Sequence, residues 1–141
     1  MEDRYLFRAK RVKDDEWFYG NYYQITALNA LEELYTSHYI IGFVDSENRS
    51  IRFAIYENTL SHCTGLKDKN GTLIFSDDVV ALGVRTPCYG AKGVIKYQIR
   101  ACAFYVHTEY DDWYSMGEVA SHCEIIGNRH DNPELLKGDN G

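Results

Sequence analysis

The tripeptide Ser-His-Cys occurs twice, at Ser61-His62-Cys63 and at Ser121-His122-Cys123. Two histidines and two cysteines can hold a tetrahedral zinc ion, so the repeat raises the question of metal binding. Adjacent residues of a strand point to opposite faces, which prevents one tripeptide from easily giving two ligands to one ion. Spacings typical of zinc sites, such as Cys-x₂-Cys, are absent. We predict no metal or other cofactor, and small thiols in the core.

Two other kinds of catalytic group can be considered. A Cys nucleophile with a His base must meet in space and needs a third group to orient it, and the sequence shows no such group. Acidic runs at Asp14-Asp15-Glu16, Asp77-Asp78 and Asp111-Asp112 could serve magnesium or acid-base chemistry. Each run lies beside turn-like sequence, where Asp commonly bonds to its own backbone. We therefore favour a protein that is not an enzyme. The alternative is a metal-dependent enzyme or binding protein that acts on nucleic acid or nucleotides, with carboxylates near Asp78 or Asp112 holding the metal.

A basic segment opens a chain whose formal net charge is −6. Its aromatic residues Tyr5 and Phe7 could stack on nucleic acid bases. The overall acidity favours another interpretation, in which these rings enter the core and the cations face water or pair with acidic groups. Nucleic acid therefore remains a less favoured partner. The basic surface patch that we single out consists of Arg4, Arg8, Lys10 and Arg11.

The composition is that of a folded protein with a real core. The 141 residues are 45% hydrophobic and 26% charged, which is ordinary for a globular domain. We expect one domain over residues 1–136 and a frayed tail over residues 137–141. No apolar run is long enough to span a bilayer, and no N-terminal segment has the pattern of a secretion signal, so we expect the cytoplasm, no membrane partner and reduced cysteines.

Strands should dominate, because the chain has 12 Tyr, 6 Phe and 2 Trp but only 2 Pro. Tyr5, Phe7 and Ala9 alternate with basic residues, as in a half-buried strand. The other predicted strands are residues 17–25 with a break at Gly20-Asn21, then 39–44, 51–56, 93–97, 101–107, 113–116 and 122–126.

One helix and two turns are also predicted. Residues 27–35 place Leu28, Leu31, Leu34 and Tyr35 at spacings of three and four, which predicts a short helix behind Thr26 as N-cap. A terminal helical turn should begin at Asn132-Pro133. Asn70-Gly71 predicts a type I′ hairpin turn with Asp68 and Lys69 in water at its tip.

Several motifs together resemble the YopX-like family of phage and prophage proteins. The densest block is Thr64 to Gly71, TGLKDKNG, followed by Ile74-Phe75 and by Asp78-Val79-Val80. The remaining matches are Phe7-Arg8-Ala9, Trp17, Tyr19-Gly20, Gly93 to Tyr97, Ile126-Gly127-Asn128 and Asn132 to Leu136. The chain departs from the family pattern at Cys63, where an aromatic residue is frequent. It departs again at Ser76-Asp77-Asp78, where Glu-Gly-Asp is frequent, so Asp77 should adopt a backbone conformation that suits glycine.

The resemblance implies a β-rich fold, a phage or prophage origin and a bacterial cytoplasmic setting, and it brings no established activity and no catalytic residue. We therefore expect an α+β, predominantly β, fold with a bent or barrel-like antiparallel sheet and one short helix. The expected role is that of an accessory protein that works by protein binding. Its partner would be a second copy of itself, in a homo-oligomer, or a host or phage protein.

Overall fold

The computed structural model describes residues 6–43 and 49–136, and its chain forms two compact units. The first unit is Met1–His62 and the second is Cys63–Gly141. Arg4 and the expected tail at residues 137–141 lie outside the described residues. The expectation of one domain over residues 1–136 stays a prediction. Within the described ranges, no helix combines the length and apolar character needed to cross a membrane.

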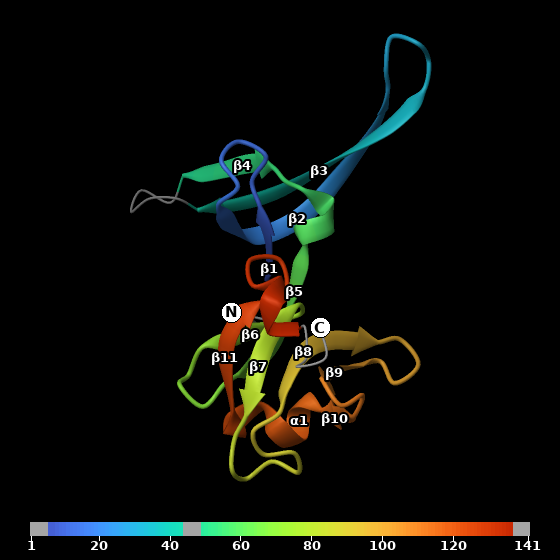
Figure 1. Cartoon of the computed structure of the whole chain (residues 1–141). Coiled ribbons are helices and arrows are strands. Elements are labelled where there is room, and N and C mark those ends of the chain that lie inside the picture. Colours follow the sequence, from blue (N-terminus) through green and yellow to red (C-terminus); the bar gives the residue numbers. More distant parts are fainter. Residues whose placement is uncertain (1–5, 44–48, 137–141) are drawn as a thin grey trace. The chain divides into compact units, whose positions relative to one another are not determined.

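An antiparallel meander forms the first unit (Figure 1). Its neighbours lie in the order β4-β3-β2-β1-β5. The bounds are β1 Phe7–Lys10, β2 Trp17–Leu28, β3 Leu34–Phe43, β4 Ser50–Ala54, the 3₁₀ turn η2 Glu57–Thr59 and β5 Ser61–Lys67, which continues into the second unit. A single bridge joins Arg11 to Ile55 across the bent meander, which is not closed into a barrel. Ala9, Ile40 and Ile55 are buried inside the bend.

The predicted helix over residues 27–35 is wrong, because these residues form the end of β2, a turn and the start of β3. Eight pairs join the two strands, from Asn21–Ile41 to Leu28–Leu34. The leucines that suggested an apolar helical stripe are exposed. Their spacing results from a hairpin loop between two strands, and among the described residues they have no core to pack against.

The predicted break at Gly20-Asn21 is also absent, since β2 continues through both residues. A Cβ atom at Gly20 would lie 2.1 Å from the backbone oxygen of Ile41. Glycine is therefore needed because the two backbones approach closely, and the strand is not interrupted.

The second unit contains an antiparallel sheet in the order β10-β9-β8-β7-β11 and a small ladder between β5 and β6. The elements are β6 Leu73–Phe75, β7 Asp78–Leu82, β8 Lys92–Gln98, β9 Ala103–Thr108, β10 Trp113–Ser115, the helix α1 Met116–Val119, the 3₁₀ turns η3 Ala120–His122 and η4 Pro133–Leu136, and β11 Cys123–Asn128. Its core includes Ile95 and Val106 from the sheet with Met116 and Val119 from α1. The predicted β-rich fold with one short helix is confirmed, although the helix is α1 rather than residues 27–35. The predicted turn at Asn132-Pro133 is η4.

The turn between β5 and β6 differs in type from the prediction. A type I′ turn requires a positive φ at both central residues. Gly71 has a φ of +82°, but Asn70 is not one of the described residues with positive φ, so the turn is not of type I′. Gly71 N–H donates to Asp68 O, and Asp68 N–H donates to Thr72 O. This is a type I turn with a glycine bulge, the usual three-residue hairpin loop.

Asp68 is buried, contrary to the expectation of a wet tip. Its Oδ1 accepts the N–H groups of Asn70 at 2.9 Å and Thr72 at 3.0 Å. Its Oδ2 accepts the Ile125 N–H at 3.0 Å, which ties the hairpin to β11. Burial by itself raises the pKa of this carboxyl, but the backbone N–H groups of Ile125, Thr72 and Asn70 stabilise the anion, and the pKa is lowered from its ordinary 3.8.

Gly71→Val should destabilise the protein by roughly 1–2 kcal/mol, because a β-branched residue is strained at positive φ. A Cβ at this position meets no atom within 4 Å, so the loss would report backbone strain alone. Gly71→Asn is the matched control, since Asn tolerates this region of φ. Urea denaturation gives both values, and equal stability of the Val variant and the wild type would refute the turn assignment.

Asp68→Asn should remove an acid-dependent part of the stability. The pKa of Asp68 is lower in the folded protein than its ordinary value of 3.8. The wild-type carboxylate therefore stabilises the fold at pH values above 3.8, and this stabilisation is lost as the pH falls through the folded pKa. The free energy of unfolding, measured by denaturation between pH 7 and pH 2, should therefore fall less steeply below about pH 4 for the variant than for the wild type. Parallel curves for the two proteins would contradict the role of this carboxylate.

Candidate functional site

A two-stranded arm is the most unusual feature of the first unit. We define the arm as residues 25–37, which include the end of β2, the turn and the start of β3. Figure 1 shows this hairpin extending beyond the other strands of its unit. Within the described residues, β1 pairs with β2 only at Trp17–Gly20, and β4 pairs with β3 only at Tyr39–Phe43. The arm therefore has two open strand edges.

The arm carries apolar side chains that the first unit leaves in solvent. The exposed fractions are 62% for Leu28, 77% for Leu31 and 74% for Leu34. Leu28 and Leu34 face each other as a cross-strand pair near the turn. On the other face of the ribbon, Ile25 and Tyr35 are exposed as well. Both faces thus present apolar surface, which is typical of interaction sites.

The amide side chain of Asn29 holds the turn of the arm. Its Oδ1 accepts the N–H of Leu31 at 2.8 Å and the N–H of Glu33 at 3.0 Å. Glu32 N–H donates to Asn29 O, and Asn29 N–H donates to Glu33 O. Glu32 takes the left-handed conformation, with a φ of +60°. The turn has the same hydrogen bonds as the Asp68 turn, with Glu32 in the place of Gly71.

The predicted basic patch is largely engaged in local contacts. Arg8 is buried, with 8% exposure and its guanidinium 4.8 Å from the Trp17 ring, so the expectation that it faces water is wrong. The Lys10 ammonium lies 5.5 Å from the same ring. Arg11 forms ion pairs with Asp14 and Glu16 and stacks 4.4 Å from the Phe53 ring. The ion pairs of Arg11 are the pairing with acidic groups that we expected as one alternative, whereas the contacts of these cations with aromatic rings were not predicted.

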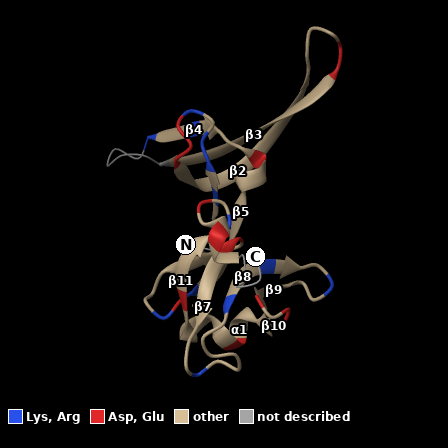
Figure 2. Ribbon diagram, viewed as in Figure 1, with Lys and Arg blue, Asp and Glu red and all other residues tan. Residues whose placement is uncertain are grey.

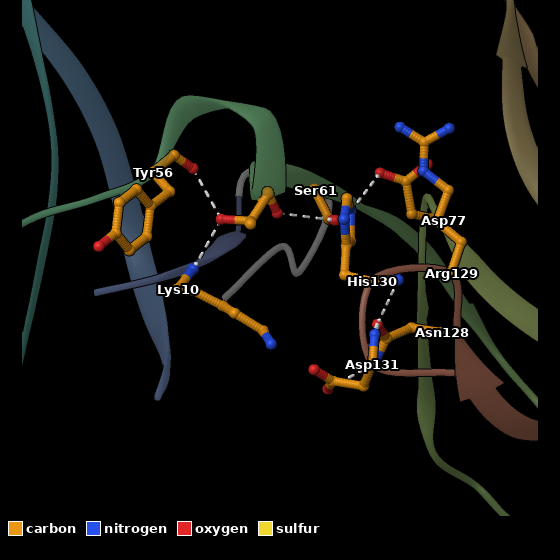
Figure 3. Close-up of polar contacts among 9 residues, drawn as sticks. Lys10, Tyr56, Ser61, Asp77, Asn128, Arg129, His130 and Asp131 are labelled. Carbon is orange, nitrogen blue, oxygen red and sulfur yellow. Dashed lines mark hydrogen bonds and ion pairs between the residues drawn. The ribbon is translucent and has the colours of Figure 1, made fainter. Parts of the chain in front are cut away.

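The backbone of the basic strand is tied to η2. Lys10 N–H donates to Thr59 Oγ1 at 2.9 Å, and that hydroxyl donates to Tyr56 O at 2.7 Å (Figure 3). Ser61 Oγ donates to Thr59 O at 3.3 Å. Thr59 therefore links β1 to the segment that leads into β5.

The Ser-His-Cys tripeptides have structural contacts. Cys63 and Cys123 are both fully buried thiols, and His62 stacks on Phe7 with ring centroids 4.7 Å apart. Cys123 Sγ donates to Ala120 O at 3.2 Å. Burial, together with a smaller contribution from the charge of Asp68, raises the pKa of Cys123 to about 11. A thiol with this pKa is a poor nucleophile at neutral pH.

The acidic runs lie in or directly beside turns. Asp77 has a φ of +70°, which confirms the glycine-like conformation expected at this position. Its carboxylate accepts Arg129 Nε at 3.1 Å and contacts His130 Nε2 at 3.1 Å (Figure 3). Asp78 is buried, and its Oδ2 accepts the Phe75 N–H at 2.8 Å. Within the described ranges, no three His, Cys, Asp or Glu side chains gather in a group that could hold a metal ion.

The arm is concealed in the sequence because the apolar spacing of residues 27–35 predicts a helix, although the strand propensity of the flanking residues favours a hairpin. Thr26 and Thr36 pair across the ribbon through their hydroxyls at 2.9 Å, and both residue types favour strands. Asn29, the residue that closes the turn, was the available signal, since Asn commonly bonds to backbone two residues further on.

Comparisons with known proteins point to one family. The family model described as YopX protein matches residues 6–137, nearly the whole chain. A crystal structure of protein EF1440 from Enterococcus faecalis is similar, with 19% sequence identity, a TM-score of 0.47 and coverage of 93% of this chain and 96% of that chain. Comparison with curated proteins finds no match.

Asn29→Ala should loosen the arm without unfolding the first unit, because the side chain bonds only within the exposed turn. The amides of Leu31 and Glu33 lose their acceptor, so their hydrogen exchange, followed by NMR, should accelerate. Asn58→Ala, an exposed Asn in η2, is the matched control. Unchanged exchange at both amides would contradict the turn geometry.

Proposed function

The chain belongs to the YopX protein family, and from this premise we propose that it acts by binding protein rather than by catalysis. Its proposed setting is the bacterial cytoplasm, as an accessory protein of a phage or prophage. The proposed partner is a second copy of the chain, joined through the arm at residues 25–37. The observation that carries the proposal is the open, apolar and exposed ribbon of that arm.

An isolated two-stranded ribbon is marginally stable in water, because it cannot bury an apolar face. Within the arm, β2 pairs with β3. Among the described residues, no third strand pairs with β2 after Gly20 or with β3 before His38. Its open edges present unpaired backbone groups, which favour the addition of a further strand. A partner that adds a strand would satisfy those groups and cover the leucines together.

A second copy fits this edge well. Two identical edges can pair around a twofold axis, so each arm meets the same residues of the other arm. The cross-strand threonines Thr26 and Thr36 are uncharged and suited to strands. Glu32 and Glu33 sit at the turn, where like charges would oppose contact between the two tips. Pairing along the strands avoids that repulsion.

The mass in solution tests this proposal directly. Light scattering should give a mass above the 16.3 kDa of a single chain, and Leu34→Asp should shift the mass toward that value. The physical reason is that a charge on the apolar ribbon must lose its water when the arm is covered. Ile99→Asp is the matched control, because Ile99 is 80% exposed and lies outside the arm.

A single-chain mass for the wild type at high concentration would overturn the proposal. An oligomer that Leu34→Asp and Ile99→Asp leave equally intact would also overturn it, since the interface would then lie elsewhere. Thermal melting of both variants checks that each remains folded.

A further inference from the structure

A groove in the second unit has the size and lining of a small-molecule site. It has a volume of about 310 Å³ and lies against β8, β9 and η4. Ligand pockets begin at about this volume. Lys92, Val94 and Lys96 line it from β8, and the intervening Ile95 belongs to the core on the opposite face. The alternation of a strand thus places two ammonium groups on one wall.

A chain of contacts fixes one of these ammonium groups. Lys96 Nζ lies 3.2 Å from His107 Nδ1, and His107 Nε2 lies 2.7 Å from Asp111 Oδ1. A lysine ammonium only donates, so Nδ1 accepts a hydrogen bond from Lys96, and Nε2–H donates one to the Asp111 carboxylate. The His107 ring stacks on Trp113 with centroids 4.0 Å apart, and Lys96 Nζ lies 5.7 Å from that ring. The Lys96 ammonium is therefore positioned before any ligand binds.

The acidic side chains of the groove already have donors. Glu109 Oε1 accepts the backbone N–H of Lys92 at 3.1 Å, and Asp111 accepts His107. In the part of the chain that the structure describes, the Lys92 ammonium has no hydrogen-bond or ion-pair partner. Lys96 uses one of its three donors on His107. Figure 2 shows basic segments on β8 and acidic segments in the turn after β9. The Lys92 ammonium and the two remaining donors of Lys96 are thus available to an anion along the β8 wall of the groove.

The rest of the lining is apolar and comes from two directions. Val94 contributes from β8, and Leu135 and Leu136 contribute from η4. Two lysines and two carboxylates give the lining a formal charge near zero, so an anion is held by the hydrogen bonds of the two ammonium groups, and a doubly charged phosphate gains no net attraction. We infer that this groove binds a small carboxylic acid, with the carboxylate on Lys92 and Lys96 and a short apolar chain against Val94 and η4.

Titration with hexanoate, followed by NMR of the full chain, tests this site. The expected result is saturable shifts confined to β8, β9 and η4. Lys92→Gln and Lys96→Gln should each weaken hexanoate binding roughly tenfold, because each removes a charge-assisted hydrogen bond. Lys67→Gln is the matched control, since Lys67 is an exposed lysine on β5 that does not line the groove, and its affinity should equal that of the wild type.

Three uncharged or differently charged probes complete the test. Hexanol, hexylammonium and inorganic phosphate should each bind more weakly than hexanoate. Equal binding of hexanol or hexylammonium would overturn the role of the lysines, and equal binding of phosphate would overturn the role of the apolar wall. Failure of hexanoate to saturate would overturn the site. If Lys96→Gln proves unfolded by thermal melting, Lys92→Gln decides the outcome, because among the described residues the Lys92 ammonium has no hydrogen-bond or ion-pair partner.

Discussion

A side-chain oxygen that accepts two backbone N–H groups of a tight turn is the interaction on which three of the described hairpins depend. Asn29, Asp68 and Thr108 each accept two such N–H groups, from the second and fourth residues that follow. The residue three positions on takes a positive φ in all three turns: Glu32, Gly71 and Asp111. One solution for reversing the chain therefore recurs in both units.

The three turns serve different ends because their surroundings differ. The Asp68 turn is buried against β11, so its carboxylate becomes part of the core network of the second unit. The Thr108 turn places Asp111 on His107 beside the groove. The Asn29 turn closes an arm whose residues face solvent, and this exposure is the basis for proposing a binding role. Local backbone chemistry sets the shape of each hairpin, and the packing around it sets what the hairpin can do.

Much of the fold could be predicted from alternation and turn residues, and the failures have physical causes. The strands around Ile40, Ile95 and Val106 were predicted because aromatic and β-branched residues suit a half-buried sheet. The apolar spacing of residues 27–35 predicts a helix only if one face of that helix is buried, and in the described part of the chain these leucines are exposed. The burial of Asp68 could not be predicted, since its third hydrogen bond comes from Ile125, 57 positions away.

The candidate site shows the same division between local and distant information. The glycine-like conformation of Asp77 could be predicted from its place in the family pattern, but its contacts with Arg129 and His130 could not. Arg8 was expected in water because it alternates with apolar neighbours, yet the Trp17 ring on the adjacent strand covers it. Cross-strand partners of this kind depend on register, which a single sequence does not specify.

Hydrogen exchange of the arm at several protein concentrations tests the central claim most directly. If a second copy covers the arm, the amides of residues 34–37 on β3 should exchange more slowly as the concentration rises. Core amides such as that of Ile95 should not change and act as an internal reference. Exchange of the arm amides that is fast and independent of concentration would contradict the claim that the arm is a binding element for a second copy.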